Sequence, residues 1–140
     1  WERYPDGIRM VKAVGPAYHP SMFKEALRSV VEGTAGGYAG LLMDFEGIPV
    51  ESYVSDTSPF DIEVVGAEVS VLVKQIQRAT EMLEAGDTRE VAFKSDRMVT
   101  LIRVINENYF VAMTLAPDAN YGKGRYLLRV LAPRLQDELS

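Results

Sequence analysis

The sequence predicts one α+β domain in the order helix, two strands, helix, three strands, helix. Two observations predict this class. Apolar residues recur at helical spacing in residues 21–34, in residues 61–84 and in a last segment that ends near Leu139. Between these segments lie short apolar runs bounded by turn residues, which are typical of strands. The chain has 140 residues, of which 47% are apolar and 25% charged, so it has room for one ordinary domain with a core.

Residues 1–20 are predicted to form an extended arm or the end of a linker, outside a domain of residues 21–140. Prolines and glycines interrupt regular structure throughout this segment. Its apolar residues leave two alternatives open, docking on the domain or adding a strand. The domain begins with a helix over residues 21–34, whose inward stripe consists of Phe23, Ala26, Leu27, Val30 and Val31.

The next two segments are predicted to be strands joined in a hairpin. Residues 38–45 are apolar on both faces, which favours a central position in a sheet. Glu46 and Gly47 form a tight turn, and residues 48–54 return. Pro49 removes a ladder donor from the returning strand, so this strand is predicted to lie at an edge.

The long helix over residues 61–84 has two apolar faces on opposite sides. Asp61 is suited to start it, and Gly86 follows its end. A small domain needs one apolar stripe, so the second must meet another layer of the chain, a second copy or a partner. One face consists of Ile62, Val65, Val69, Leu72, Val73, Ile76, Thr80 and Leu83, and the other of Val64, Ala67, Val71 and Met82.

Three strands and a helix complete the domain. Residues 89–95 alternate, with Val91 and Phe93 on one face. In residues 98–105, Val99 and Leu101 lie opposite Thr100, Ile102 and Val104. Residues 109–115 are largely apolar and therefore central. The last helix is predicted to reach about Leu139. Pro133 is expected to kink it about one turn earlier. The inward positions of this helix are Leu127, Leu128, Leu131, Leu135 and Leu139.

The order of elements and two sequence strings resemble the Roadblock domain family, called Roadblock/dynein light chain in eukaryotes. The hairpin GYAGLLMDFEGIPVES is similar to the family's strand, Asp-x-x-Gly turn and return strand. The string NYFVAMTLAPDANYGKGRYLLR is similar to its last strand, Pro-Asp-x-Asn loop and helix start. The resemblance covers about residues 21–139, and Pro133 departs from it.

The resemblance implies a three-layer α/β/α fold with a five-stranded antiparallel sheet in the order 2-1-5-4-3. The long helix would cover one face and the two terminal helices the other. Family members typically form homodimers, in which the free edge strand pairs with its copy and the long helices lie side by side. The dimer interface expected here consists of Val64, Ala67, Val71, Gln75, Met82, Glu90, Val91, Ala92, Phe93 and Lys94.

The resemblance also implies a partner. Bacterial Roadblock proteins, including the one that controls gliding motility, act as GTPase-activating partners. We therefore expect a non-catalytic, cytoplasmic regulator or scaffold that binds a small Ras-like GTPase through Glu68, Lys74, Gln75 and Arg78. Two alternatives remain open: a dimeric assembly module without a GTPase client, and a sensor of small molecules.

The residues predict no catalytic group, metal site or cofactor. The chain lacks cysteine, and His19 is the one histidine, without a second ligand beside it. Gly122-Lys123-Gly124 lacks the spacing of a phosphate loop, so Gly124 is interpreted as a close approach of helix and sheet. A weak anion site at Lys123 and Arg125 is the alternative. Fifteen basic and twenty acidic residues give a net charge of −5, which argues against nucleic-acid binding. No apolar run is long enough to insert into a membrane.

Two further features invite a catalytic interpretation, but a structural interpretation of each is preferred. Asp44 and Glu46 form a pair of carboxylates, but they flank a turn and are interpreted as surface turn residues. Arg78 leaves an inserted arginine finger open as an alternative. An arginine at the solvated rim of a dimer is the preferred interpretation.

Overall fold

The computed structural model describes residues 20–139, so His19 and nearly all of the predicted arm lie outside the described residues. Eight elements follow one another in the predicted order. They are α1 (Pro20–Glu32), β1 (Gly37–Asp44), β2 (Pro49–Val54), α2 (Ile62–Met82), β3 (Glu90–Lys94), β4 (Val99–Val104), β5 (Tyr109–Leu115) and α3 (Tyr121–Leu139).

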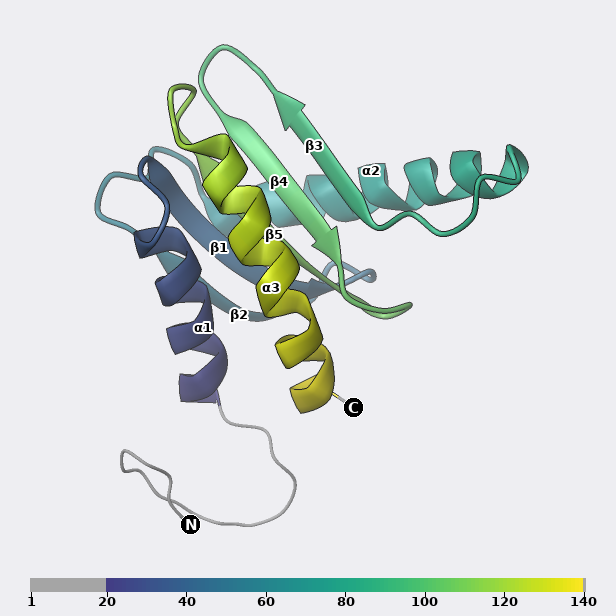
Figure 1. The fold of residues 1–140 in the computed structure, drawn as a ribbon, viewed down its shortest axis with the longest axis horizontal. Helices are drawn as coiled ribbons and strands as arrows, with labels where there is room; N and C mark the ends of the chain where they lie inside the picture. Colours follow the sequence, from purple (N-terminus) through teal and green to yellow (C-terminus); the bar gives the residue numbers. More distant parts are fainter. Residues whose placement is uncertain (1–19, 140) are drawn as a thin grey trace.

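The five strands form one sheet in the order β2-β1-β5-β4-β3, and all of the pairings are antiparallel. Figure 1 shows α2 on one face of the sheet and α1 with α3 on the other. This arrangement confirms the predicted fold class and strand order. Pro49 begins edge strand β2, where the missing N–H costs no ladder bond to a second neighbour.

Side chains from alternate strand positions build two cores, one on each face of the sheet. Both cores draw on the central strands β1 and β5, which explains their nearly continuous apolar sequences. The core under α1 and α3 includes Phe23, Leu27, Leu42, Val111, Met113, Leu128 and Leu135. The core under α2 includes Leu41, Met43, Ile62, Val69, Val73, Ile102 and Phe110.

Helix α2 begins as predicted, but two residues of its predicted sheet-facing stripe are exposed. The Asp61 side chain accepts hydrogen bonds from the N–H groups of Glu63 and Val64 and caps the helix. The prediction that Leu72 and Leu83 face the sheet was wrong, because their exposed fractions are 37% and 76%. Leu72 lies at the border of the inward stripe, and Leu83 follows the last helical residue.

Two small residues complete the inward stripe of α2. Gly66 and Ser70 are buried and lie between the predicted apolar positions. A Cβ atom on Gly66 would lie 2.2 Å from Leu41 Cδ2 and 2.8 Å from Met43 Cε. The glycine therefore lets the helix backbone approach β1 closely. An apolar periodicity cannot reveal such a position, because glycine carries no side chain to count.

Helix α3 continues through Pro133 to Leu139, as the leucine spacing predicts. Pro133 lies on the exposed side, whereas Leu131, Ala132 and Leu135 are buried. The proline ring therefore takes no part in the contact with the sheet. Helix packing through the flanking residues offsets the backbone hydrogen bond that proline cannot donate.

A side-chain hydrogen bond between α1 and β2 makes a small part of the stability depend on pH. The Tyr53 hydroxyl donates to the Glu32 carboxylate, and this bond lowers the Glu32 pKa below its ordinary value of 4.5. The contribution is present above that ordinary pKa and is lost as the pH falls through the lower, folded pKa. We expect Tyr53→Phe to flatten this part of the acid dependence in urea unfolding. A Tyr53→Phe variant as acid-sensitive as wild type would contradict this assignment.

Candidate functional site

The exposed face of α2 carries the second apolar stripe that the sequence predicts. Val64, Val71 and Met82 have exposed fractions of 60%, 52% and 79%. Ala67, Gln75 and Arg78 are exposed on the same side, at helical spacing. The buried residues Gly66, Val69 and Val73 lie on the opposite side. No element among residues 20–139 covers the exposed stripe, and leaving it in water costs free energy.

The C-terminal half of α2 projects beyond the sheet. In Figure 1 the helix crosses behind the strands and extends past β3, the free edge. Its 21 residues span about 32 Å, whereas five strands span about 19 Å. The helix is thus longer than the sheet is wide. The exposure of Met82 and Leu83 follows from this mismatch.

Strand β3 offers a second unpaired surface beside α2. It pairs with β4, and no other strand among residues 20–139 lies on its outer side. Val91 and Phe93 are half-buried and pack against the core under α2, and Ala92 and Lys94 are exposed. An edge of this kind presents N–H and C=O groups that can pair with another strand. The structure therefore places the predicted stripe of α2 and the predicted edge strand next to each other.

Glu90 differs from the other predicted edge residues because its carboxylate is engaged on the opposite face. It accepts a hydrogen bond from Arg125 Nε at 2.8 Å and lies 3.5 Å from Arg103 Nη1. The hydrogen bond and the charge of Glu90 raise the pKa of Arg125. The Glu90 side chain thus ties β3 to β4 and α3, and only its backbone remains available at the edge.

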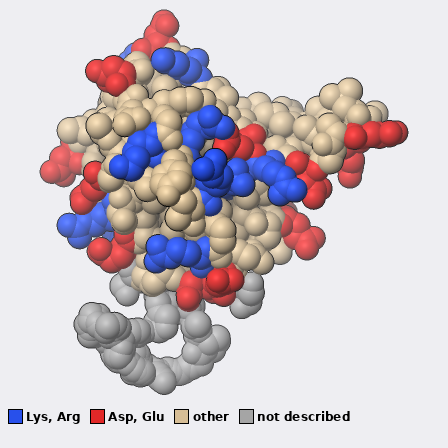
Figure 2. Space-filling view, viewed as in Figure 1, with Lys and Arg blue, Asp and Glu red and all other residues tan. Residues whose placement is uncertain are grey.

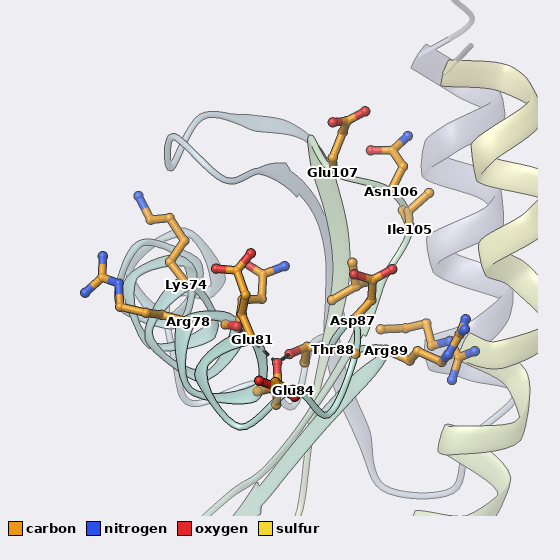
Figure 3. Close-up of a pocket in the computed structure, with 15 residues that line it drawn as sticks. Lys74, Arg78, Glu81, Glu84, Asp87, Thr88, Arg89, Ile105, Asn106 and Glu107 are labelled. Atoms are coloured by element: carbon orange, nitrogen blue, oxygen red, sulfur yellow. Dashed lines mark hydrogen bonds between the residues drawn. The ribbon is translucent and has the colours of Figure 1, made fainter.

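A cleft of about 970 Å³ separates the projecting end of α2 from the sheet. Figure 3 shows Glu81 and Glu84 on the helix side and Asn106 and Glu107 on the strand side. The Thr80 and Thr88 hydroxyls share a hydrogen bond of 2.9 Å near its base. Sequence reasoning missed this cleft. Its lining residues come from segments that meet only because the helix overhangs, and a comparison of helix length with sheet width is the one signal that was available.

The predicted partner-binding residues are all exposed on α2. Lys74 and Arg78 lie at the rim of the cleft, and in Figure 3 they point away from the strands. Neither forms an ion pair within residues 20–139. Glu68 lies nearer the start of the helix, and Gln75 directly follows Lys74. The structure therefore brings these four residues onto one helix, beside the apolar stripe.

Asp44 and Gly124 have structural roles in the described part of the chain. Asp44 Oδ1 accepts hydrogen bonds from the N–H groups of Glu46 and Ile48 and so holds the hairpin turn. A Cβ on Gly124 would lie 3.1 Å from Leu101 Cδ1, in agreement with a close approach of α3 to the sheet. Residues 20–139 contain no group of three potential metal ligands and no helix long and apolar enough to span a membrane.

Comparisons with known proteins identify the family. No family model matches the chain, and no curated protein matches it. The Roadblock/LC7 domain from Streptomyces avermitilis is 16% identical over 83% of this chain and 96% of that chain, with a TM-score of 0.74. MglC from Myxococcus xanthus is 36% identical over 83% of this chain and 98% of that chain, with a TM-score of 0.61. The chain belongs to the Roadblock family.

MglB structures share the Roadblock fold with this chain. The gliding protein MglB from Thermus thermophilus is 16% identical over 91% of this chain and 96% of that chain, with a TM-score of 0.77. An MglB with a tetrameric arrangement is 17% identical over the same shares, with a TM-score of 0.78. At these identities the likeness concerns the fold. The family resemblance predicted from the hairpin and the C-terminal string is confirmed.

Proposed function

We propose that this Roadblock protein is a non-catalytic regulator or scaffold that forms a homodimer through α2 and β3 and binds a small Ras-like GTPase. The observation that carries the proposal is the exposed apolar stripe of α2, opposite the face that covers the sheet. A stripe of this size on a small domain marks a surface that is buried in an assembly. The tetrameric arrangement of the related MglB supports self-association.

The geometry of α2 and β3 suits a two-fold interface. In such an interface the same patch occurs on both copies, so one stripe meets its own copy. Pairing of β3 with the partner's β3 would satisfy the unpaired backbone groups of both edges. The projecting end of α2 would then reach over the partner's sheet. The proposal assigns the cleft beneath this projection to the second copy.

The polar end of the same stripe is the proposed GTPase contact. Toward the C-terminal half of α2, the exposed apolar residues give way to Gln75 and Arg78, with Lys74 beside them. Exposed charges around an apolar centre favour a specific and rapidly formed complex. Glu68 lies on the same helix and adds the opposite charge.

Binding to the Ras-like GTPase encoded nearest to this protein's gene tests the GTPase assignment. We expect a complex whose affinity depends on whether the GTPase carries GDP or a GTP analogue. Arg78→Glu should weaken the complex about tenfold, because it reverses a charge at the proposed rim. Lys24→Glu on α1 is the matched control and should leave affinity unchanged. A protein that neither binds the GTPase nor alters its hydrolysis rate contradicts this part of the proposal.

A dimeric assembly module without a GTPase client is the second candidate. One observation favours it: Tyr126 and Val130 of α3 are also exposed, on the face of the sheet opposite α2. A protein with interaction surfaces on both faces can hold two partners at once. A protein that self-associates but does not bind the GTPase would support this second candidate.

A further inference from the structure

The outer face of α3 combines exposed aromatic, aliphatic and basic side chains. Tyr126 and Val130 have exposed fractions of 51% and 47% and lie one turn apart. Arg125 and Arg129 lie beside them along the helix. The Arg129 guanidinium carbon lies 5.6 Å from the centre of the Tyr126 ring, so the arginine rests on the aromatic face. Such stacking holds a guanidinium in a fixed direction without consuming its hydrogen-bond donors.

Positive charge gathers over the middle of this face of an otherwise acidic protein. Figure 2 shows lysine and arginine side chains gathered over its middle, and acidic side chains mostly around its outline. Glu90 is shared between Arg103 and Arg125, which leaves an excess of one positive charge in that cluster. Arg129 forms no ion pair with any residue of the described range. The whole chain carries a net charge of −5, so this local excess is not an effect of composition.

We propose that the surface formed by Arg103, Arg125, Tyr126, Arg129 and Val130, here called the basic α3 surface, binds an acidic, amphipathic segment of a partner protein. Carboxylates of the segment would pair with the arginines, which offer several donors in a planar fork. Its apolar side chains would cover Tyr126 and Val130. Aromatic and arginine side chains grouped in this way are typical of the energetically important centre of a protein interface.

The shape of the charge distribution favours a protein segment over an extended polyanion. A lipid surface or a nucleic acid would also meet the acidic outline visible in Figure 2 and would be repelled there. Asp137 and Glu138 follow at the end of α3 and limit the surface in that direction. A phosphate backbone has no apolar groups to cover the exposed Tyr126 and Val130 side chains. A narrow ligand with both acidic and apolar side chains fits all three features.

Fluorescence anisotropy with a labelled amphipathic peptide of glutamate and leucine tests the proposal. We expect this peptide to bind, and a matched peptide of lysine and leucine to fail. Arg129→Glu should weaken binding about tenfold, and Tyr126→Ala by a similar factor. Lys24→Glu is the control, because it changes the net charge by the same amount as Arg129→Glu. Lys24 lies on α1 beside Glu51 of β2, outside the basic α3 surface, so this variant should change affinity less than about twofold. Circular dichroism of each variant would test whether the fold is retained.

Equal binding of both peptides would overturn the proposal, and so would binding of the acidic peptide that Arg129→Glu leaves intact. Tighter binding to phosphatidylserine vesicles or to duplex DNA than to the peptide would also overturn it, in favour of a polyanion. The basic α3 surface lies on the opposite face of the sheet from α2. A Val71→Asp protein should therefore bind the peptide as wild type does, which separates this inference from the proposed homodimer and its GTPase.

Discussion

Replacing Val71 by aspartate is expected to give a folded protein that no longer self-associates. Val71 is 52% exposed in the single chain and lies in the middle of the proposed seam on α2. A two-fold interface places the substituted residue on both copies, so two unpaired charges would lose water at once. We expect the dissociation constant of the dimer to rise at least about a hundredfold. Light scattering and sedimentation velocity over a range of concentrations measure this change.

Val69→Asp is the matched control, since it places the same charge two residues earlier on the same helix. Val69 is 2% exposed and packs in the core under α2. An unpaired carboxylate there costs several kcal/mol, on the order of the whole stability of a domain. This variant should lose its folded circular dichroism spectrum. An intact Val71→Asp dimer would remove the interface assignment, and equal behaviour of both variants would refute the division of α2 into two faces.

Local patterns explain how much of the fold could be predicted. Period-two alternation and turn residues locate the strands, because each strand meets a core or water on a defined face. The proline in β2 locates one edge without any tertiary information. The order of the remaining strands came from the family resemblance, because pairing between distant segments leaves no local pattern in one sequence.

The site was predictable only where it depends on one helix. The stripe with Val64 and Val71 is visible in the sequence because its members recur at helical spacing. The cleft under the end of α2 is not visible, because its lining combines α2 with residues far along the chain, such as Asn106 and Glu107, whose position depends on the sheet. The pairing of Arg103 and Arg125 with Glu90 is hidden for the same reason.

Gly66→Val is expected to destabilise the domain by about 2 kcal/mol or more. Even the first added carbon would lie 2.2 Å from Leu41 Cδ2 and 2.8 Å from Met43 Cε. These atoms end flexible side chains, but Leu41 and Met43 are both 0% exposed and have no open space to enter. Overpacking of this kind costs about 1–3 kcal/mol per site, and valine adds two further methyl groups. Replacing glycine inside a helix recovers only about 0.4 kcal/mol of helix propensity.

Urea unfolding, followed by circular dichroism, measures this effect, and Ala79→Val on the same helix is its control. Ala79 is exposed, so valine there should cost only about 0.5 kcal/mol of helix propensity. Because α2 must move away from β1 to admit the new side chain, Gly66→Val should also shift the exposed stripe and weaken self-association. If Gly66→Val were as stable as Ala79→Val, the packing between α2 and β1 could accommodate the added side chain. The close approach of the two backbones would then not determine the position of the exposed stripe.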